Sequence, residues 1–313
     1  MLKLKPVFKE YIWGGTRLKE LFGRDNGGKI IAESWEVSVH PDGESYTEEG
    51  TLREYLSAHP KAIPTAADDF PVLIKYIDAA QNLSVQVHPN DEYARRVEGD
   101  NGKTEAWYIL AAESGAGIYC GFRRDTSPEA LKAAIEAGTV EHILNFIPVK
   151  AGDFFLIKAG TVHAIGAGCV ICEVQESSNV TYRVYDYHRK DAEGKLRPLH
   201  IDKALEFINF RAYRNPVRRG SAVKLKSGTM RTLTDCKYFR LRELQFCGTL
   251  STYSRRSFLA VNVLSGKGVI NGTPYTAGDS FFVPHKERIT LVGEGTILLT
   301  DAGRRQHEVL CRN

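Results

Sequence analysis

Polar side chains alternate with valines in the stretch SVQVHPND, residues 84–91. In an extended strand successive side chains point to opposite faces, so Ser84, Gln86 and His88 share one face while the valines between them take the other. The Pro-Asn-Asp that follows ends the strand, because these residues favour turns. The stretch therefore brings three polar groups, of which two are of metal-ligand type, to a single face.

Two further segments offer side chains of the same kind. In GKTEAWYIL, alternation places Lys103 and Glu105 on one face, and in GTVHAIGAG the imidazole of His163 lies in an apolar segment bounded by glycines. Together with Gln86 and His88, they provide two imidazole nitrogens and two oxygens. This mixture suits zinc, with Mn, Co, Fe or Ni as chemically possible substitutes. Because the set includes few charged ligands, it leaves positions for water or substrate, which favours catalysis over a structural role.

Each of these residues also has a structural interpretation. A histidine in a strand is more often a hydrogen-bonded structural residue than a ligand, and Glu105 can face solvent or pair with Lys103. Gln86 carries almost no signal by itself. The metal site is therefore a hypothesis that depends on all four residues meeting.

Basic residues accompany the candidate ligands. Lys75 interrupts the apolar strand PVLIKYI, where a charge is costly unless it is paired. Lys103 shares a face with Glu105, and Arg183 follows the polar run QESSN. Near a metal, lysine and arginine suit a phosphate, which arginine binds bidentately and lysine binds as a point charge. The alternative is that Lys75 and Arg183 pair with structural carboxylates.

Short apolar segments separated by Gly, Pro, Asn and Asp dominate the chain. The predicted strands are 34–40, 70–79, 105–110, 116–122, 153–159 and 169–176. This pattern favours a mainly β sandwich or barrel over βαβ units. Helices are predicted at 51–59, with a threonine that could cap it, and at 201–210. A small helical segment is predicted at about 124–147, in which Ser127 is a plausible cap before Pro128 and Gly138 is a likely stop.

The two halves of the chain share a segment. VKAGDFFLIKAGTVHAI (149–165) resembles YTAGDSFFVPHKERITL (275–291), and alignment on Ala-Gly-Asp places His163 opposite Ile289. The similarity predicts two related β-barrels, of which only the first carries the chemistry. A polar, basic stretch after about residue 212 separates them. The predicted domains are a catalytic unit over 1–212 and a metal-free unit over 213–313.

The composition is that of a soluble globular protein. The chain has 313 residues, of which 42% are hydrophobic and 26% charged, and its net charge of +4 comes without a Lys/Arg tract that would indicate nucleic-acid binding. No apolar run approaches the roughly 18 residues of a membrane span, and the first residues lack the apolar core of a signal peptide. Six cysteines, including the lone Cys169-x-x-Cys172 pair, indicate reduced thiols in a cytoplasmic protein.

Several motifs occur in the order found in one enzyme family. YIWGG, AESWEVSVHP, SVQVHPND, GKTEAWYIL, GTVHAIGAG and QESSNVTYRVYDY resemble type I mannose-6-phosphate isomerases (phosphomannose isomerases), most closely the short bacterial form. The resemblance covers residues 1 to about 210 and, more weakly, the remainder. It implies two cupin-type (jelly-roll) β-barrels with a small helical portion. It also implies one Zn²⁺ per chain, held by Gln86, His88, Glu105 and His163.

The same resemblance implies roles around the metal. The implied substrate-binding and catalytic residues are Lys75, Ser84 and Lys103 for the phosphate, Trp13 in the pocket lining, Arg183 as active-site arginine and Glu173 near the substrate. The segment that contains Arg183 is a loose version of that in the longer enzymes, because its spacing from His163 is one residue greater. Arg183 is therefore assigned on a weaker match than the metal ligands.

The implied reaction interconverts mannose 6-phosphate and fructose 6-phosphate through an enediol, in a monomer or homodimer. Arg183 is expected to stabilise the enediolate, and the candidates for the base are Glu173, a zinc-bound water and His88. Two alternatives stay open from the residues alone. One is another cupin metalloenzyme, such as a dioxygenase, and the other is a non-catalytic sugar-phosphate-binding cupin.

Overall fold

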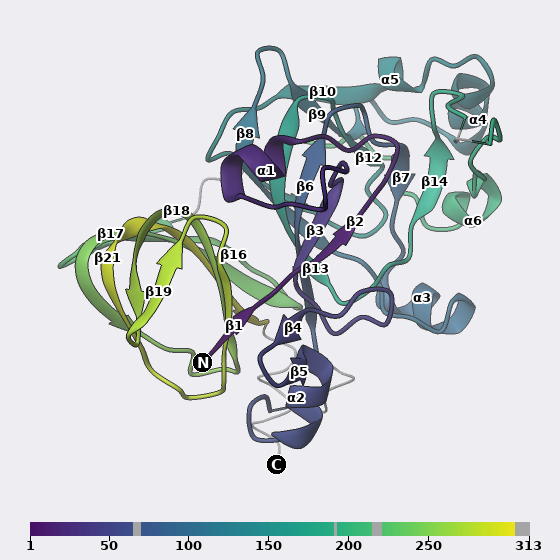
Figure 1. Ribbon diagram of the computed structural model, residues 1–313. Helices are drawn as coiled ribbons and strands as arrows, with labels where there is room; N and C mark the ends of the chain where they lie inside the picture. Colours follow the sequence, from purple (N-terminus) through teal and green to yellow (C-terminus); the bar gives the residue numbers. More distant parts are fainter. Residues whose placement is uncertain (65–69, 191–192, 215–220, 304–313) are drawn as a thin grey trace.

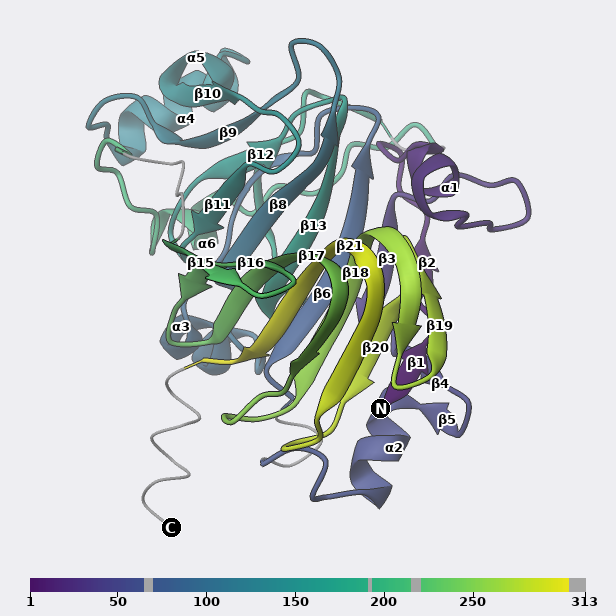
Figure 2. The same ribbon diagram turned by 90° about the vertical axis from the view of Figure 1, so that its left-hand side faces the viewer.

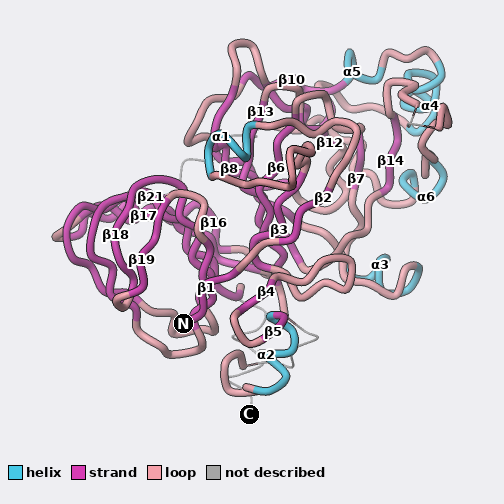
Figure 3. The backbone as a smooth tube through the Cα atoms, viewed as in Figure 1, coloured by secondary structure: helices cyan, strands magenta, loops and turns pink. Residues whose placement is uncertain are grey.

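The computed structural model describes residues 1–64, 70–190, 193–214 and 221–303. Strands predominate, as predicted, and the pairing within each sheet is antiparallel (Figures 1 and 3). In the described part of the chain, no helix has both the length and the apolar character needed to cross a membrane.

Three large sheets and a two-stranded ribbon make up the β structure. The six-stranded sheet, in the order β11-β8-β13-β6-β3-β2, contains β2 (Val7–Lys9), β3 (Glu33–Val37), β6 (Val72–Ala79), β8 (Glu105–Ala112), β11 (Phe154–Ile157) and β13 (Cys169–Glu176). The five-stranded sheet, in the order β10-β9-β12-β7-β14, contains β7 (Val85–Val87), β9 (Gly117–Phe122), β10 (Leu144–Pro148), β12 (His163–Ile165) and β14 (Tyr182–Tyr185). The ribbon pairs β4 (Tyr46–Thr47) with β5 (Gly50–Thr51).

The third sheet lies mostly in the last hundred residues. It contains β1 (Leu2–Leu4), β15 (Ser221–Leu225), β16 (Gly228–Asp235), β17 (Phe239–Thr252), β18 (Leu259–Ile270), β19 (Thr273–Thr276), β20 (Ser280–Val283) and β21 (Ile289–Ala302). Strand β1 pairs with β20, so the first residues of the chain complete the C-terminal sheet (Figure 2). The predicted boundary near residue 212 stays a prediction.

Apolar layers hold the sheets together. One core cluster lies between the six- and five-stranded sheets and combines Trp107 and Ile171 of the first with Ile118 and Ile165 of the second. Another joins the opposite face of the six-stranded sheet to the C-terminal sheet. The hydrogen bonding keeps these sheets separate, so none of the three closes into a barrel in the described residues. The observed architecture is a set of packed antiparallel sheets. The two predicted jelly-roll barrels are a more specific description, and they stay a prediction.

The helices are short and peripheral. They are α1 (Arg17–Phe22), α2 (Leu52–Ala58), α3 (Asp91–Val97), α4 (Pro128–Glu136), α5 (Val140–Ile143) and α6 (Ile201–Leu205). Thr51 forms a capping box with Glu54 at the start of α2, and Ser127 caps α4 before its N1 proline, as the sequence predicted.

Two helix predictions extended too far. The end of the segment predicted at 124–147 is strand β10, because its backbone pairs with β9 instead of continuing the helix. The helix predicted at 201–210 ends with Leu205, and the Asn209 amide donates to the Gly160 carbonyl. In both places a distant partner takes the backbone groups that a longer helix would use.

The repeated Ala-Gly-Asp segments form the same turn. Gly152 and Gly278 have φ values of 87° and 93°, the left-handed region that favours glycine. In each turn the aspartate, Asp153 or Asp279, accepts the backbone N–H of the residue three positions earlier, at 3.0 and 2.8 Å. The strand after each turn pairs with an earlier strand, β11 with β8 and β20 with β18.

The matching registers identify equivalent positions in the two copies. Glu105 lies opposite Ile157, the fourth residue after the first turn aspartate, and Leu259 lies opposite the fourth residue after the second. Leu259 therefore occupies the position of Glu105, just as Ile289 occupies that of His163. Both Leu259 and Ile289 are buried in the apolar core of the C-terminal sheet.

Candidate active site

Strands β7, β8 and β12 bring the candidate metal ligands together. His163 pairs directly with Gln86 across the β12–β7 ladder, His88 follows β7, and Glu105 begins β8 in the other sheet of the sandwich. The ligand atoms of His88, Glu105 and His163 all lie within 4.8 Å of one another. The Gln86 amide nitrogen lies 3.4 Å from His163 Nε2. The four residues singled out by alternation thus meet at one point.

Both imidazoles are oriented by main-chain carbonyls. His88 Nδ1 lies 2.9 Å from the Val180 oxygen, and His163 Nδ1 lies 2.8 Å from the Thr161 oxygen. Because a carbonyl can only accept, each Nδ1 carries a proton, which in the neutral ring leaves the lone pair on Nε2. His163 Nε2 is 3.1 Å from Glu105 Oε1, and His88 Nε2 is 3.4 Å from Oε2. The lone pairs therefore face the carboxylate.

The charges and protonation states at this site favour the binding of a cation. Burial, followed by the charge of Lys103, lowers the pKa of His88 to about 3, so the ring is neutral. Burial opposes ionisation of Glu105, but the adjacent Lys103 ammonium outweighs it and holds the pKa of the carboxyl well below its usual range. Lys103 Nζ lies 2.9 Å from Oε2, yet neither Glu105 oxygen accepts a hydrogen bond of good geometry within the described residues.

The donor set therefore fits a divalent metal ion. Two imidazole nitrogens, a buried carboxylate with unused oxygens and an adjacent amide satisfy the usual preferences of zinc. A metal ion would also satisfy the buried oxygens, which otherwise remain a cost to folding.

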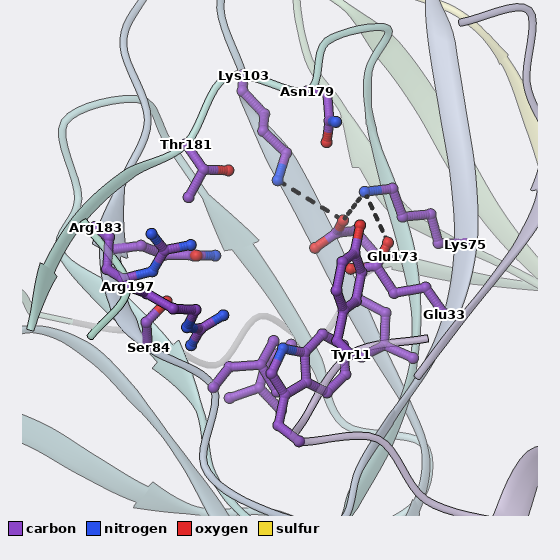
Figure 4. Close-up of a pocket in the computed structure, with 15 residues that line it drawn as sticks. Tyr11, Glu33, Lys75, Ser84, Lys103, Glu173, Asn179, Thr181, Arg183 and Arg197 are labelled. Carbon is purple, nitrogen blue, oxygen red and sulfur yellow. Dashed lines mark ion pairs between the residues drawn. The ribbon is translucent and has the colours of Figure 1, made fainter. Parts of the chain in front are cut away.

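A cavity of about 300 Å³ opens beside this cluster. On one wall, Lys75 lies 3.4 Å from Glu33 and 3.8 Å from Glu173, and Lys103 lies 3.9 Å from Glu173 (Figure 4). Trp107 Nε1 donates to Glu173 at 2.8 Å and fixes its carboxyl. Burial raises the pKa of Glu173, and the nearby Glu105 carboxylate raises it further, against the pull of the two lysines.

The facing wall carries arginines and a serine. Ser84 lies before β7, Arg183 belongs to β14, and Arg197 follows in the next loop (Figure 4). Arg183 pairs in register with Gln86, which places it beside the metal-ligand cluster. Arg197 donates to Asp186 through Nε and Nη2, at 2.7 and 2.5 Å.

The structure brings all ten sequence-predicted site residues to this region. The cavity itself is lined by Trp13, Lys75, Ser84, Gln86, Lys103, Glu173 and Arg183. His88, Glu105 and His163 are buried and contact that lining through Lys103 and Gln86. Their individual roles stay predictions.

Five polar or aromatic lining residues were not predicted. They are Tyr11, Glu33, Asn179, Thr181 and Arg197. Tyr11 stacks on Trp13 with 5.4 Å between ring centroids, and it lies in the same YIWGG motif, so the motif itself pointed to it. Glu33 starts the strand of AESWEVSVHP. Arg197 lies 14 residues after Arg183, beyond any strand periodicity, and the sequence gives no local signal for it.

Comparisons with known proteins point to one enzyme family. The family model for the catalytic domain of type I phosphomannose isomerase matches residues 1–114. The mannose-6-phosphate isomerase ManA of Bacillus subtilis is 41% identical over 297 residues, which cover 91% of this chain and 93% of that protein. The mannose-6-phosphate isomerase of Streptococcus mutans is 38% identical, with 86% of each chain covered.

Solved structures share the fold. The crystal structure of the Bacillus subtilis mannose 6-phosphate isomerase superimposes with a TM-score of 0.89 at 33% identity, over 96% of this chain and 99% of that one. A putative mannosephosphate isomerase from Archaeoglobus fulgidus gives a TM-score of 0.78 at 22% identity, over 97% and 98% of the chains, a likeness of fold alone. On the identity and coverage of these relatives, the chain belongs to the type I mannose-6-phosphate isomerase family.

Proposed function

We propose that this protein interconverts mannose 6-phosphate and fructose 6-phosphate. The observation that carries the proposal is the buried His88–Glu105–His163 cluster beside a cavity lined by ion-paired acids and lysines. The relatives that cover most of the chain are named for this reaction. Membership of the family and the chemistry of the cavity therefore favour the same activity.

Four side chains would hold the metal. Gln86, His88, Glu105 and His163 offer the oxygen and nitrogen donors that zinc prefers. When bound, the ion would supply a Lewis acid that polarises a sugar oxygen. Lys103, which lies 3.2 Å from His88 Nε2, adds a fixed positive charge next to that position.

Glu173 is the proposed base for moving the proton between C2 and C1. A carboxyl whose pKa is raised by burial accepts a proton more readily than a solvated one, and it can return the proton to the neighbouring carbon. The Trp107 hydrogen bond holds its position. His88 is a poorer candidate, because its Nε2 faces Glu105 and Lys103.

Arg183 would stabilise the negative charge of the enediolate. It lies beside Gln86 in the β14–β7 ladder, and its buried Nε has no hydrogen-bond partner within the described residues. A fixed cation with an unused donor stabilises charge that develops during the reaction without reorganising.

We also propose that the two units are cupin-type jelly-roll barrels and that the second is structural. Leu259 and Ile289 occupy the positions of Glu105 and His163, so two ligand side chains are replaced by apolar ones. A cytoplasmic monomer or homodimer remains the expected form.

The test is a coupled assay with mannose 6-phosphate after chelation and after zinc is restored. Chelation should abolish turnover and zinc should restore it. His163→Ala should lower turnover by more than the roughly 10- to 100-fold that loss of an outer-shell partner costs, together with its bound zinc. His59→Ala, which changes an exposed histidine at the end of α2, is the matched control. Full activity of chelated protein would contradict the proposal, and oxygen consumption by an iron-loaded form would favour a dioxygenase.

A further inference from the structure

The positive charges around the cavity are unevenly compensated. Lys75 and Lys103 lie within 4 Å of three carboxylates, those of Glu33, Glu105 and Glu173. These two lysines are therefore neutralised by their own wall. Lys103 also lies 3.2 Å from His88 Nε2, which places its ammonium at the reacting end of the cavity.

The opposite wall has a surplus of positive charge. Arg183 and Arg197 of this wall share Asp186 with Arg189, which lies outside the cavity lining, and Asp186 is the one acidic partner of the three among the described residues. Burial lowers the pKa of Arg183, and the nearby positive charge of Arg197 lowers it further. Arg183 donates from Nη1 to the Pro198 carbonyl at 2.9 Å, while its Nε has no hydrogen-bond partner in the described part of the chain. This wall therefore carries guanidinium donors and charge that the protein itself does not use.

Asp186 fixes the direction of the remaining Arg197 donors. The carboxylate takes Nε and Nη2, which form one edge of the guanidinium, and leaves Nη1 free of that contact. Figure 4 shows Arg197, Arg183 and Ser84 together on the side of the cavity away from Lys75 and Glu173. A side chain held by a bidentate pair binds an anion with little further loss of rotamer entropy.

The extended chain from Ser84 to Gln86 sets the distance between the two ends of the cavity. Ser84 precedes Gln86 by two residues, so about 7 Å of strand separates the serine from the candidate metal ligand. That length is on the scale of a hexose chain between its reacting carbons and a phosphate on C6. A sugar whose C1 and C2 lie near the metal-ligand cluster therefore extends its phosphate towards Ser84.

We propose that Arg197 binds the substrate phosphate together with Ser84, at the end of the cavity remote from the metal-ligand cluster. The inference rests on the proposed function for the identity of the sugar. It retains Ser84 from the residues that the family resemblance assigned to the phosphate. It assigns Lys75 and Lys103 to the reacting end instead.

The test measures phosphate binding separately from turnover. Arg197→Met should weaken the binding of inorganic phosphate, measured by titration calorimetry, by about 10- to 100-fold, the usual range for loss of a charge-assisted hydrogen bond. The KM for mannose 6-phosphate should rise by a similar factor, while kcat and any turnover of unphosphorylated mannose change far less. Arg197→Lys keeps the charge but loses the planar fork, so it should weaken phosphate binding by a smaller factor.

Arg189→Met is the matched control. Arg189 also contacts Asp186, at 2.5 Å, but does not line the cavity. It should leave phosphate binding unchanged. The inference is overturned if Arg197→Met and Arg197→Lys bind phosphate as the parent protein does, or if Arg189→Met weakens binding equally. Absence of isomerase activity in the parent protein would contradict the proposed function, whereas the calorimetric result would still decide the role of Arg197.

Discussion

At the scale of single residues, Glu173 is the group whose environment differs most from that of an ordinary strand glutamate. It is buried on β13, within 4 Å of two lysines, and it accepts a hydrogen bond from Trp107. Nearby Glu105 is held ionised by Lys103. Two carboxyls a short distance apart are thus driven in opposite directions, one towards holding a proton and one towards losing it.

Glu173→Gln should therefore impair proton transfer while substrate binding is largely kept. The amide oxygen can still accept from Trp107, so the local structure is preserved, but the group no longer takes a proton. We expect kcat to fall by about 10²- to 10⁴-fold with a smaller change in KM. Because burial raises the pKa of Glu173, the activity of the parent protein should rise with pH as the carboxyl ionises. The variant should not show this rise.

The measurement is the pH profile of kcat, together with exchange of the C2 proton into solvent. Glu113→Gln, which changes an exposed carboxylate beside Arg17, serves as the control and should match the parent. A Glu173→Gln variant that exchanges the proton at the parental rate would remove Glu173 as the base.

Residue patterns in the sequence predicted the centre of this site better than its rim. The alternation in SVQVHPND placed Ser84 and Gln86 on one face, because period two is fixed by strand geometry. Arg197 reaches the same cavity from a loop after β14, and its position depends on the Asp186 pair. Such a contact follows from tertiary structure and has no periodic signature.

At the scale of elements, the two Ala-Gly-Asp turns offer an internal comparison. Both glycines need positive φ, so alanine at either position costs about 1 to 2 kcal/mol of backbone strain. The surroundings differ. A Cβ on Gly152 would have its nearest neighbour at 3.9 Å, whereas one on Gly278 would come within 2.7 Å of the Phe22 Cβ.

Gly278→Ala should consequently destabilise the protein more than Gly152→Ala. The second variant is the matched control, because it carries the same strain without the clash against α1. Urea unfolding should give a free energy of unfolding lowered by about 1 to 2 kcal/mol for Gly152→Ala and by a larger amount for Gly278→Ala. Equal losses would show that α1 moves away freely and that its contact with the second turn contributes little.

The predictions of strands and helix caps were correct where they depended on local sequence patterns. Strand 169–176 coincides with β13, and the α2 and α4 caps were visible as Thr51 and Ser127. The errors at 144–147 and 206–210 arose where the backbone finds partners far along the chain, in β9 and at Gly160. Hydropathy cannot distinguish a short apolar helix from a strand in such places.

At the scale of the whole molecule, buried polar contacts join the six-stranded sheet to the C-terminal sheet. Glu36 on β3 accepts from Arg24 at 2.7 Å and from Ser280 on β20 at 2.8 Å. Arg24 also donates to the Gly278 carbonyl. Strand β3 pairs with β6, which carries Lys75. Through its contacts with β3, the C-terminal sheet therefore supports one wall of the cavity without contributing a candidate ligand to it.

A second junction predicts how stability depends on pH. Glu176, at the end of β13, accepts from the Thr104 amide at 2.7 Å, and its neighbour Asp91 lies 3.6 Å from Lys237 before β17. Burial, followed by the charge of Asp91, raises the pKa of Glu176 to about 9. The folded protein therefore binds this proton more tightly than the unfolded chain, whose glutamate has an ordinary pKa.

The contribution of Glu176 to stability is thus complete at acidic pH and is lost as the pH rises towards 9. Each unit of pKa difference corresponds to about 1.4 kcal/mol, so the effect over this window should reach a few kcal/mol. Glu176→Gln mimics the protonated form, since its amide can accept from Thr104 and donate to Asp91. Urea unfolding at pH 5, 7 and 9 should show the parent losing stability relative to this variant as pH rises. Glu92→Gln, an exposed change on α3, should follow the parent, and parallel curves for the parent and Glu176→Gln would show that Glu176 is already ionised in the folded protein.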